Sequence, residues 1–182
     1  TLSPSQIRFW KKLLIRGMGE FFYTNRIDFT ASNFVRIQSA QKKGLGRPVP
    51  LRARFAFPAP ERDVLIPVGG GKDSAVTCEL IKRARKGAKS ARLGCFVLNP
   101  ASIASACAVV RKSGIKHKVT AVRTIDPALL HMNHAGYLNG HTPFSAYLAF
   151  LSTCAAWTFG YRSVALSQER SSNEGNVVFH GK

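Results

Sequence analysis

The clearest structural signal in this chain is the run Val64-Leu65-Ile66-Pro67-Val68-Gly69-Gly70-Gly71-Lys72-Asp73-Ser74. Its five apolar residues predict a buried strand. Its three glycines allow a tight turn whose backbone N–H groups converge with no Cβ to block an anion. Asp73-Ser74 then opens a helix whose N-terminal dipole favours negative charge, and Lys72 adds a cation. The order strand, glycine loop and helix therefore predicts a phosphate site.

Two common phosphate loops do not fit this run. The Walker A loop requires a glycine where Ile66 stands and a serine or threonine where Asp73 stands. The dinucleotide fingerprint requires a third glycine where this chain has Ser74, and no acidic residue occurs between Glu79 and Asn99. A turn that binds nothing is the structural alternative. However, a lysine-bearing loop without bulky side chains has little purely structural purpose.

Apolar runs and helical patterns alternate along the rest of the chain. This alternation predicts an α/β fold, with a Rossmann-like parallel sheet and helices on both faces. We expect an N-terminal region over residues 1–60, with a helix, short strands and a basic linker, and an α/β domain over residues 61–182 that is incomplete at its C-terminus. The expected strands of the α/β domain are 63–68, 92–98, 116–122 and 162–167, and its helices are 73–86, 101–113 and 143–159, with a loop before the last helix. In the N-terminal region we expect a helix up to about residue 16 that Ser3-Pro4 caps, and strands over 27–30, 34–37 and 52–57.

Positive charge dominates the composition. The 182 residues include 27 Lys and Arg against 9 Asp and Glu, which gives a net charge of +18. Such an excess attracts polyanions, so a nucleic-acid partner is one interpretation. The basic residues are nevertheless spread over the predicted helices and loops, and no aromatic-plus-basic RNA-binding signature is present. A solvated basic surface explains the charge equally well, and a nucleic-acid partner is not favoured.

Neither a membrane span nor a signal peptide is indicated by the sequence. Uninterrupted apolar runs stay below the roughly 18 residues that a spanning helix needs. The four cysteines show no C-x-x-C pairing and lie in apolar surroundings, so we expect buried, reduced thiols. These features favour a cytoplasmic protein, and they give no indication of its oligomeric state.

Two polar segments are expected beside the glycine loop, because ligands of open parallel sheets bind beyond the carboxyl ends of the strands. The first, Asn139-Gly140-His141-Thr142-Pro143-Phe144-Ser145, opens a predicted helix. Helix capping explains Thr142 and Pro143 but not His141. The second, residues 166–176, follows a predicted strand and contains Glu169, Arg170 and Glu174. Carboxylates beside phosphate are natural Mg²⁺ ligands, whereas a solvated polar loop is the alternative.

The glycine loop resembles the PP-loop of the N-type ATP pyrophosphatases, whose signature is Ser-Gly-Gly-x-Asp-Ser, with Gly69 at the place of the serine. The glycine loop and the two polar segments together resemble the UDP-N-acetylmuramoyl-L-alanyl-L-glutamate epimerase family of peptidoglycan synthesis. The resemblance runs from about residue 64 to residue 176. Two departures are that Ser167-Gln168-Glu169-Arg170 stands where the family tends to have Ser-Asn-Glu-Arg, and that family members are considerably longer.

This resemblance implies an ATP- and Mg²⁺-dependent epimerase whose substrate is the UDP-linked muramoyl dipeptide. ATP would adenylate the carboxylate of the terminal L-glutamate, and inversion at its α-carbon would give D-glutamate with release of AMP and pyrophosphate. The residues expected to bind the nucleotide are Gly69, Gly70, Gly71, Lys72, Asp73, Ser74 and Asn99. The expected metal ligands are Asp73, Glu169 and Glu174, and the expected catalytic residues are His141 as general base, Lys72 and Arg170.

Two other functions remain open at this point. A PP-loop enzyme that modifies tRNA by adenylating a base carbonyl would account for the positive charge, although such a role is weakened by the lack of a C-x-x-C pair. A non-catalytic, basic binding protein derived from the same fold is the other alternative.

Overall fold

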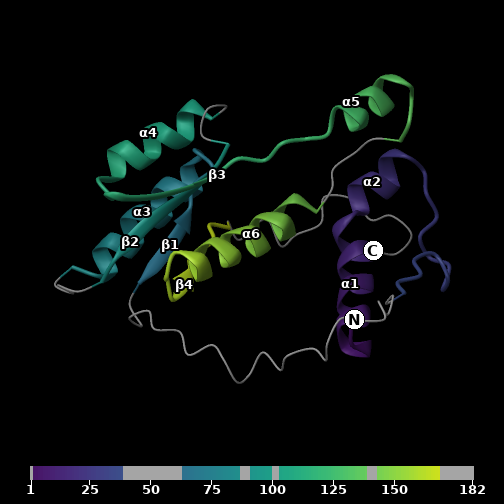
Figure 1. Cartoon of the computed structure of the whole chain (residues 1–182), viewed down its shortest axis with the longest axis horizontal. Helices are drawn as coiled ribbons and strands as arrows, with labels where there is room; N and C mark the ends of the chain where they lie inside the picture. Colours follow the sequence, from purple (N-terminus) through teal and green to yellow (C-terminus); the bar gives the residue numbers. More distant parts are fainter. Residues whose placement is uncertain (1, 39–62, 87–90, 100–102, 139–142, 169–182) are drawn as a thin grey trace, which may run out of the picture. The chain divides into compact units, whose positions relative to one another are not determined.

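The computed structural model describes residues 2–38, 63–86, 91–99, 103–138 and 143–168 (Figure 1). The described residues form two compact units. The sheet unit contains residues 63–86, 91–99, 103–125 and 147–168, and the helical unit contains residues 2–38, 126–138 and 143–146.

A four-stranded parallel sheet forms the centre of the sheet unit, in the order β3-β2-β1-β4. In the register of the central pair, Ile66 lies opposite Cys95. The prediction of a parallel α/β fold is therefore confirmed. The strands are β1 (Val64–Pro67), β2 (Leu93–Leu98), β3 (His117–Ala121) and β4 (Ser163–Val164).

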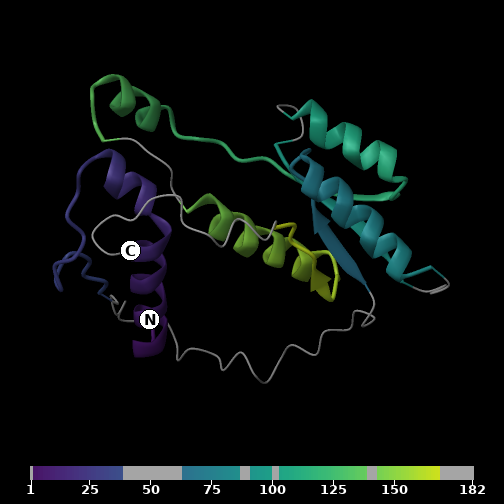
Figure 2. The ribbon, with the colours of Figure 1, turned by 180° about the vertical axis from the view of Figure 1, so that it is seen from behind.

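Helices cover both faces of this sheet, as predicted. On one face lie α3 (Lys72–Ala84) and α4 (Ala104–Ser113), and on the other lies α6 (Phe144–Thr158) (Figure 1). Figure 2 shows the same layers from behind. Two hydrophobic cores result, because successive side chains of a strand point to opposite faces.

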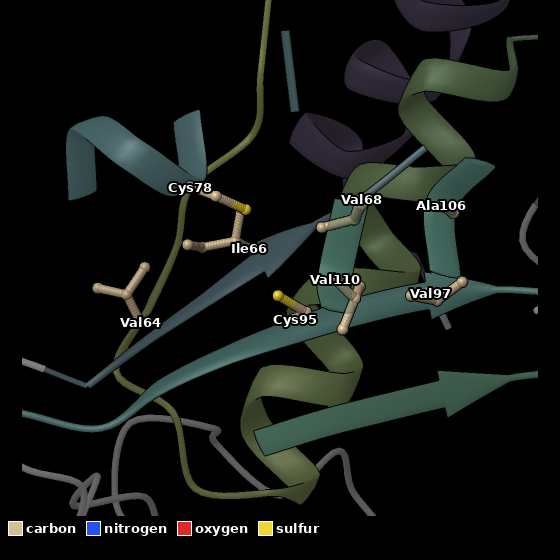
Figure 3. Packing of buried hydrophobic residues seen from close by; sticks show 8 residues of the cluster. All are labelled: Val64, Ile66, Val68, Cys78, Cys95, Val97, Ala106 and Val110. Carbon is tan, nitrogen blue, oxygen red and sulfur yellow. The ribbon is translucent and has the colours of Figure 1, made fainter. Parts of the chain in front are cut away.

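The two cores divide the residues of the central strands between them. Val64, Ile66 and Val68 pack toward α3 and α4, together with Cys95 and Val97 of β2 (Figure 3). The core on the other face joins the sheet to α6 and includes Leu65, Phe96, Leu98, Val119, Ala156 and Tyr161.

An ion pair between Arg92 and Asp63, which we call the charged brace, lies at the amino end of the sheet. The Arg92 Nε lies 3.1 Å from the Oδ2 of buried Asp63, and the Arg92 backbone N–H donates to Asp63 Oδ1 at 2.8 Å. The Arg92 guanidinium also donates to the carbonyls of Phe159 and Gly160 and lies 4.1 Å from the centre of the Tyr161 ring. The brace compensates the buried carboxylate and joins both central strands to the end of α6.

All four cysteines are free thiols, as expected. Cys78 of α3 and Cys95 of β2 are buried, and the pKa of Cys95 is raised by its contact with the Cys78 thiol and by burial. The Cys95 thiol is therefore protonated and unreactive at neutral pH. The expectation that every cysteine is buried is wrong for Cys154, which is exposed on α6, and holds only in part for half-buried Cys107.

The helical unit contains α1 (Pro4–Gly17), α2 (Gly19–Thr24) and α5 (Pro127–His134). The predicted first helix is confirmed: the Ser3 hydroxyl accepts the Gln6 N–H at 3.2 Å, and the Gln6 side chain accepts the Ser3 N–H at 2.7 Å. This reciprocal pair is a capping box.

Three local predictions are wrong. Residues 27–30 and 34–37 contain no strand, because their aromatic residues pack in a small cluster around Phe22 instead. The ring centroids of Phe22 and Phe29 lie 4.9 Å apart in a stacked pair, and those of Phe22 and Phe34 lie 5.3 Å apart in an edge-on pair. The expected loop before α6 contains α5, which Asp126 starts by accepting the Ala128 N–H at 2.8 Å. The expected strand over 52–57 lies outside the described residues.

The core leaves no room for a side chain at Gly94 of β2, because a Cβ there would overlap the hydroxyl and ring of buried Tyr161. We expect Gly94→Ala to reduce the free energy of unfolding by about 1–3 kcal/mol, the usual cost of overpacking. Thermal and urea unfolding measure this loss. Gly69→Ala is the control, because a Cβ at Gly69 meets nothing within 4 Å, and equal melting temperatures for the two variants would contradict the prediction.

Candidate functional site

The order of the strands places a switch point beside β1. From β1 the chain passes through α3 to β2 on one side, and β4 later joins β1 on its other side. In sheets of this type, ligands bind in the crevice beyond the carboxyl ends of the two strands that flank the switch point. The segments there are the glycine loop, residues 69–71, and the residues that follow β4, of which 165–168 are described.

The three glycines of the loop have different structural roles. Gly70 has a φ of +88°, and a Cβ there would overlap the backbone of Ser105 and Ala106 at the start of α4. Packing therefore explains Gly70. A Cβ at Gly69 or Gly71 would meet no described atom within 4 Å, and neither residue has a positive φ. Protein packing gives no reason for these two glycines, whereas close approach of a ligand to the backbone does.

The first turn of α3 borders this open space. Its N-cap is Gly71, which provides no side-chain hydrogen bond to the helix. The first N–H groups of a helix have no intrahelical carbonyl partners, and together they form an anion site. The hydroxyl of buried Ser74 donates to the Gly71 carbonyl at 2.9 Å, so this hydroxyl is already used inside the turn. Lys72 and Asp73 place one cation and one carboxylate in the same turn.

Ser167 adds a second feature of a binding site on the other side of the switch point. Its Oγ is buried and has no hydrogen-bond partner among the described residues. A buried hydroxyl without a partner costs about 1–3 kcal/mol, so a ligand or water is expected to complete it. The sequence placed Ser167 in a polar segment but gave no reason to select its hydroxyl.

Asn99 and Arg123 connect the carboxyl ends of β2 and β3. Asn99 has a φ of +51°; its Oδ1 accepts the Arg123 N–H at 2.6 Å, and its own N–H donates to the Ala121 carbonyl at 2.8 Å. The Arg123 guanidinium lies 5.8 Å from the centre of the Tyr147 ring. Sequence reasoning counted Arg123 only toward the net charge. Its position directly after a predicted strand was the signal that could have selected it.

Several predicted site residues lie outside the described residues, namely His141, Glu169, Arg170 and Glu174. Among the residues that are described, the structure places the glycine loop, Lys72, Asp73 and Ser74 on one segment after β1, and Asn99 directly after the neighbouring strand β2. No cluster of three potential metal ligands occurs in the described part of the chain. Within that same part, no helix is both long and apolar enough to cross a membrane.

The fold and the glycine loop together define a parallel α/β protein with an open glycine loop at its switch point. The model of the MurL N-terminal domain family matches residues 1–182, so the chain belongs to this family. No solved structure shows a significant match.

Three curated relatives carry the name UDP-N-acetyl-alpha-D-muramoyl-L-alanyl-L-glutamate epimerase. The relative from Salinispora tropica is 29% identical over 180 residues, which are 99% of this chain and 36% of the relative. The relative from a Micromonospora species is 36% identical over 114 residues, which are 63% of this chain and 24% of the relative. The relative from Xanthomonas oryzae pv. oryzae is 28% identical over 170 residues, covering 92% of this chain and 33% of the relative. The resemblance seen in the sequence is thus confirmed, and the chain spans about a third of the length of the relatives it matches most completely.

Alanine substitutions in the loop separate packing from binding. We expect Gly70→Ala to lower the melting temperature, because it adds overlap with α4 to a left-handed conformation that costs about 1–2 kcal/mol. Gly69→Ala and Gly71→Ala should retain the melting temperature and lose most of the stabilisation that we expect MgATP to give the unsubstituted chain. Thermal unfolding with and without MgATP measures both effects. A full ATP-induced shift in both Gly69→Ala and Gly71→Ala would contradict a ligand role for the loop.

Proposed function

We propose that this chain provides the ATP-binding part of an epimerase that inverts the terminal L-glutamate of UDP-N-acetylmuramoyl-L-alanyl-L-glutamate. The observation that carries the proposal is the match of the whole chain to the MurL N-terminal domain family, whose named relatives are epimerases of this substrate. The open glycine loop at the switch point supports the use of a nucleotide by this part of the protein.

The chemistry explains why an epimerase would consume ATP. An α-proton beside an ionised carboxylate is very hard to remove, because the carbanion adds negative charge next to existing charge. If a carboxylate oxygen attacks the α-phosphorus of ATP, pyrophosphate leaves and an acyl-adenylate forms, in which the acyl group no longer carries the carboxylate charge. The α-proton can then pass to a base while its electron pair moves onto the acyl oxygen as an enolate. Reprotonation on the opposite face and hydrolysis of the acyl-adenylate give the D-glutamyl product and AMP.

The described residues fit the phosphate part of this scheme. The N–H groups of residues 69–74 would bind the pyrophosphate, and the Lys72 ammonium would balance its charge. The Ser167 hydroxyl needs a partner and faces solvent-excluded surroundings, so it suits a phosphate or ribose oxygen. Asn99 fixes the neighbouring wall of the site by its bond to the Arg123 N–H.

The residues also suit Mg²⁺, which is commonly held by one or two carboxylates together with substrate phosphates. Asp73, half-buried in the first turn of α3, would be one ligand, and Glu169 and Glu174 are the proposed others. The ion would offset the charge of the triphosphate. We propose His141 as the base that removes the α-proton, and Arg170 as a group that binds a substrate carboxylate or phosphate.

A chimeric enzyme tests this function. In it, the present chain replaces the matching 36% of the Salinispora tropica relative, so that the rest of the longer polypeptide is supplied. We expect pyrophosphate release from ATP that depends on UDP-N-acetylmuramoyl-L-alanyl-L-glutamate, and we expect Asp73→Asn to reduce it at least about 100-fold. Glu79→Gln is the matched control, because Glu79 lies on the same helix and pairs with Lys82 at 2.8 Å at the surface. Equal activity of the Asp73→Asn and Glu79→Gln enzymes would remove Asp73 from the site, and turnover stimulated by tRNA instead of the muramoyl dipeptide would contradict the proposed substrate.

Isotope exchange tests proton removal separately from ATP cleavage. In deuterated water the chimeric enzyme should place deuterium at the α-carbon of the product glutamate, because the base exchanges its proton with solvent before or during inversion. Mass spectrometry and proton NMR of the hydrolysed product measure the label. Inversion without any deuterium at this carbon would contradict abstraction of the α-proton.

A further inference from the structure

One stretch of the chain carries positive charge with no negative charge to compensate it. Residues 80–125 contain eleven Lys and Arg and no Asp or Glu. The surfaces of soluble domains usually intersperse charges of both signs. This stretch includes the end of α3 and all of β2, α4 and β3, so the structure decides whether its charges are dispersed or gathered.

Six of these cations gather at the amino end of the sheet. Helices α3 and α4 lie side by side on one face, and both end where the chain enters the next strand (Figure 1). Lys118 of β3 points to this same face, because the neighbouring Val119 packs into the core on the other face. All six side chains are exposed. We call them the basic end: Arg83, Lys86, Arg111, Lys112, Lys116 and Lys118.

The protein does not neutralise the basic end. Within the described part of the chain, none of its six residues forms an ion pair. The helix dipoles give the cations in the last turns of α3 and α4 a structural role. They do not explain Lys116 and Lys118, which lie outside the helices. Like charges held close together repel one another, and a bound polyanion would offset that repulsion.

Arg85 is a second sign of an anionic partner at this end. It follows Ile81 and Cys78 at helical spacing on α3, and both of those residues pack against the sheet. The half-buried Arg85 side chain therefore continues the sheet-facing side of the helix. Its Nη1 is buried and has no hydrogen-bond partner among the described residues. A buried charged donor without an acceptor is costly, and a phosphate oxygen can accept from it.

The composition of this surface indicates which polyanion it fits. Binding to an anionic membrane combines basic and apolar side chains, but neither α4 nor β3 has an exposed large apolar residue. Single strands of nucleic acid stack their bases on aromatic rings, and α3, α4 and β3 contain no Phe, Tyr or Trp. Duplex backbones carry one charge per roughly 1.7 Å of axis and require cations alone.

We propose that the basic end binds the phosphate backbone of double-stranded nucleic acid without regard to base sequence. Arg85 would complete this surface by donating to a phosphate oxygen from the end of α3. The proposal does not depend on the catalytic function proposed above, because the basic end lies at the edge of the sheet opposite the glycine loop.

Fluorescence anisotropy with the present chain tests this binding. The probes are labelled DNA and RNA duplexes of one sequence and about 20 base pairs, titrated between about 50 and 200 mM NaCl. We expect both duplexes to bind. The logarithm of the binding constant should fall with the logarithm of the salt concentration at a slope of about −5, because each of six phosphate contacts contributes about −0.9. Changing the base sequence should alter the affinity less than about threefold.

Paired substitutions then locate the surface. Lys116→Gln with Lys118→Gln, and Arg83→Gln with Lys86→Gln, should each weaken binding at least about tenfold at 100 mM NaCl and bring the slope about 2 closer to zero. The matched control is Arg8→Gln with Lys12→Gln, which removes the same charge from exposed positions of α1 in the helical unit and should leave the slope unchanged. Circular dichroism checks that each variant is folded.

Arg85→Lys tests the buried donor, because it keeps the charge and removes the planar guanidinium. We expect weaker binding with an unchanged salt slope. Equal affinity of Arg85→Lys and the unsubstituted chain would remove Arg85 from the surface.

Three results would overturn the proposal as a whole. The first is no binding of either duplex at 50 mM NaCl. The second is an equal loss of affinity in the α1 control and in the two paired variants of the basic end, since net charge alone would then explain the binding. The third is tighter binding to phosphatidylglycerol vesicles or to poly-L-glutamate than to the duplexes at equal charge concentration, which would identify a lipid surface or an acidic protein as the partner.

Discussion

Burial of β1 on both of its faces is the constraint on which the sheet unit depends. Leu65 and Ile66 are fully buried, yet they point into different cores, so this single strand holds α6 on one side and α3 and α4 on the other. The Val68 N–H extends the pairing past the strand by donating to the Phe96 carbonyl at 2.8 Å. The chain must then reverse into α3 within a few residues, close against α4. The positive φ of Gly70 and its contact with the start of α4 make this reversal possible.

The two ends of the sheet have opposite characters. At the amino end, Asp63, Arg92 and Tyr161 satisfy one another through an ion pair, hydrogen bonds to backbone carbonyls and a stacked guanidinium. At the carboxyl end, α3 begins without a side-chain cap, the Ser167 hydroxyl lacks a described partner, and two glycines face open space. Incomplete polar satisfaction beside a rigid, well-satisfied core is typical of a functional site, because the unmet groups are those that a ligand completes.

The sequence predicted the parts of this structure in which a long apolar run or helical period dominates. The strands around Ile66 and Phe96 and the helices α3, α4 and α6 are such parts. It failed where few residues carry the signal: the aromatic residues near Phe29 mimic a strand but pack around Phe22. Only Ser163–Val164 of the predicted strand 162–167 is a strand, because β4 pairs with β1 alone at the edge of the sheet and is matched over just two residues there.

Site prediction had a similar limit. The glycine loop and its position could be predicted from residues 64–74, because strand, turn and helix are local signals. The difference between Gly70 and its two neighbours could not be predicted, since it depends on Ser105 and Ala106, which are distant in sequence.

The structure also explains part of the high net positive charge. Lys82, Arg83, Arg111 and Lys112 lie in the last turns of α3 and α4, where cations stabilise the negative ends of helix dipoles. Each of these helices starts beyond the carboxyl end of a strand and returns to the amino end of the next, so these charges lie at the end of the sheet away from the glycine loop. Helix stabilisation therefore explains a part of the positive charge without a polyanion partner. At the site itself, the positive potential comes from Lys72 and from the N–H groups of the first turn of α3.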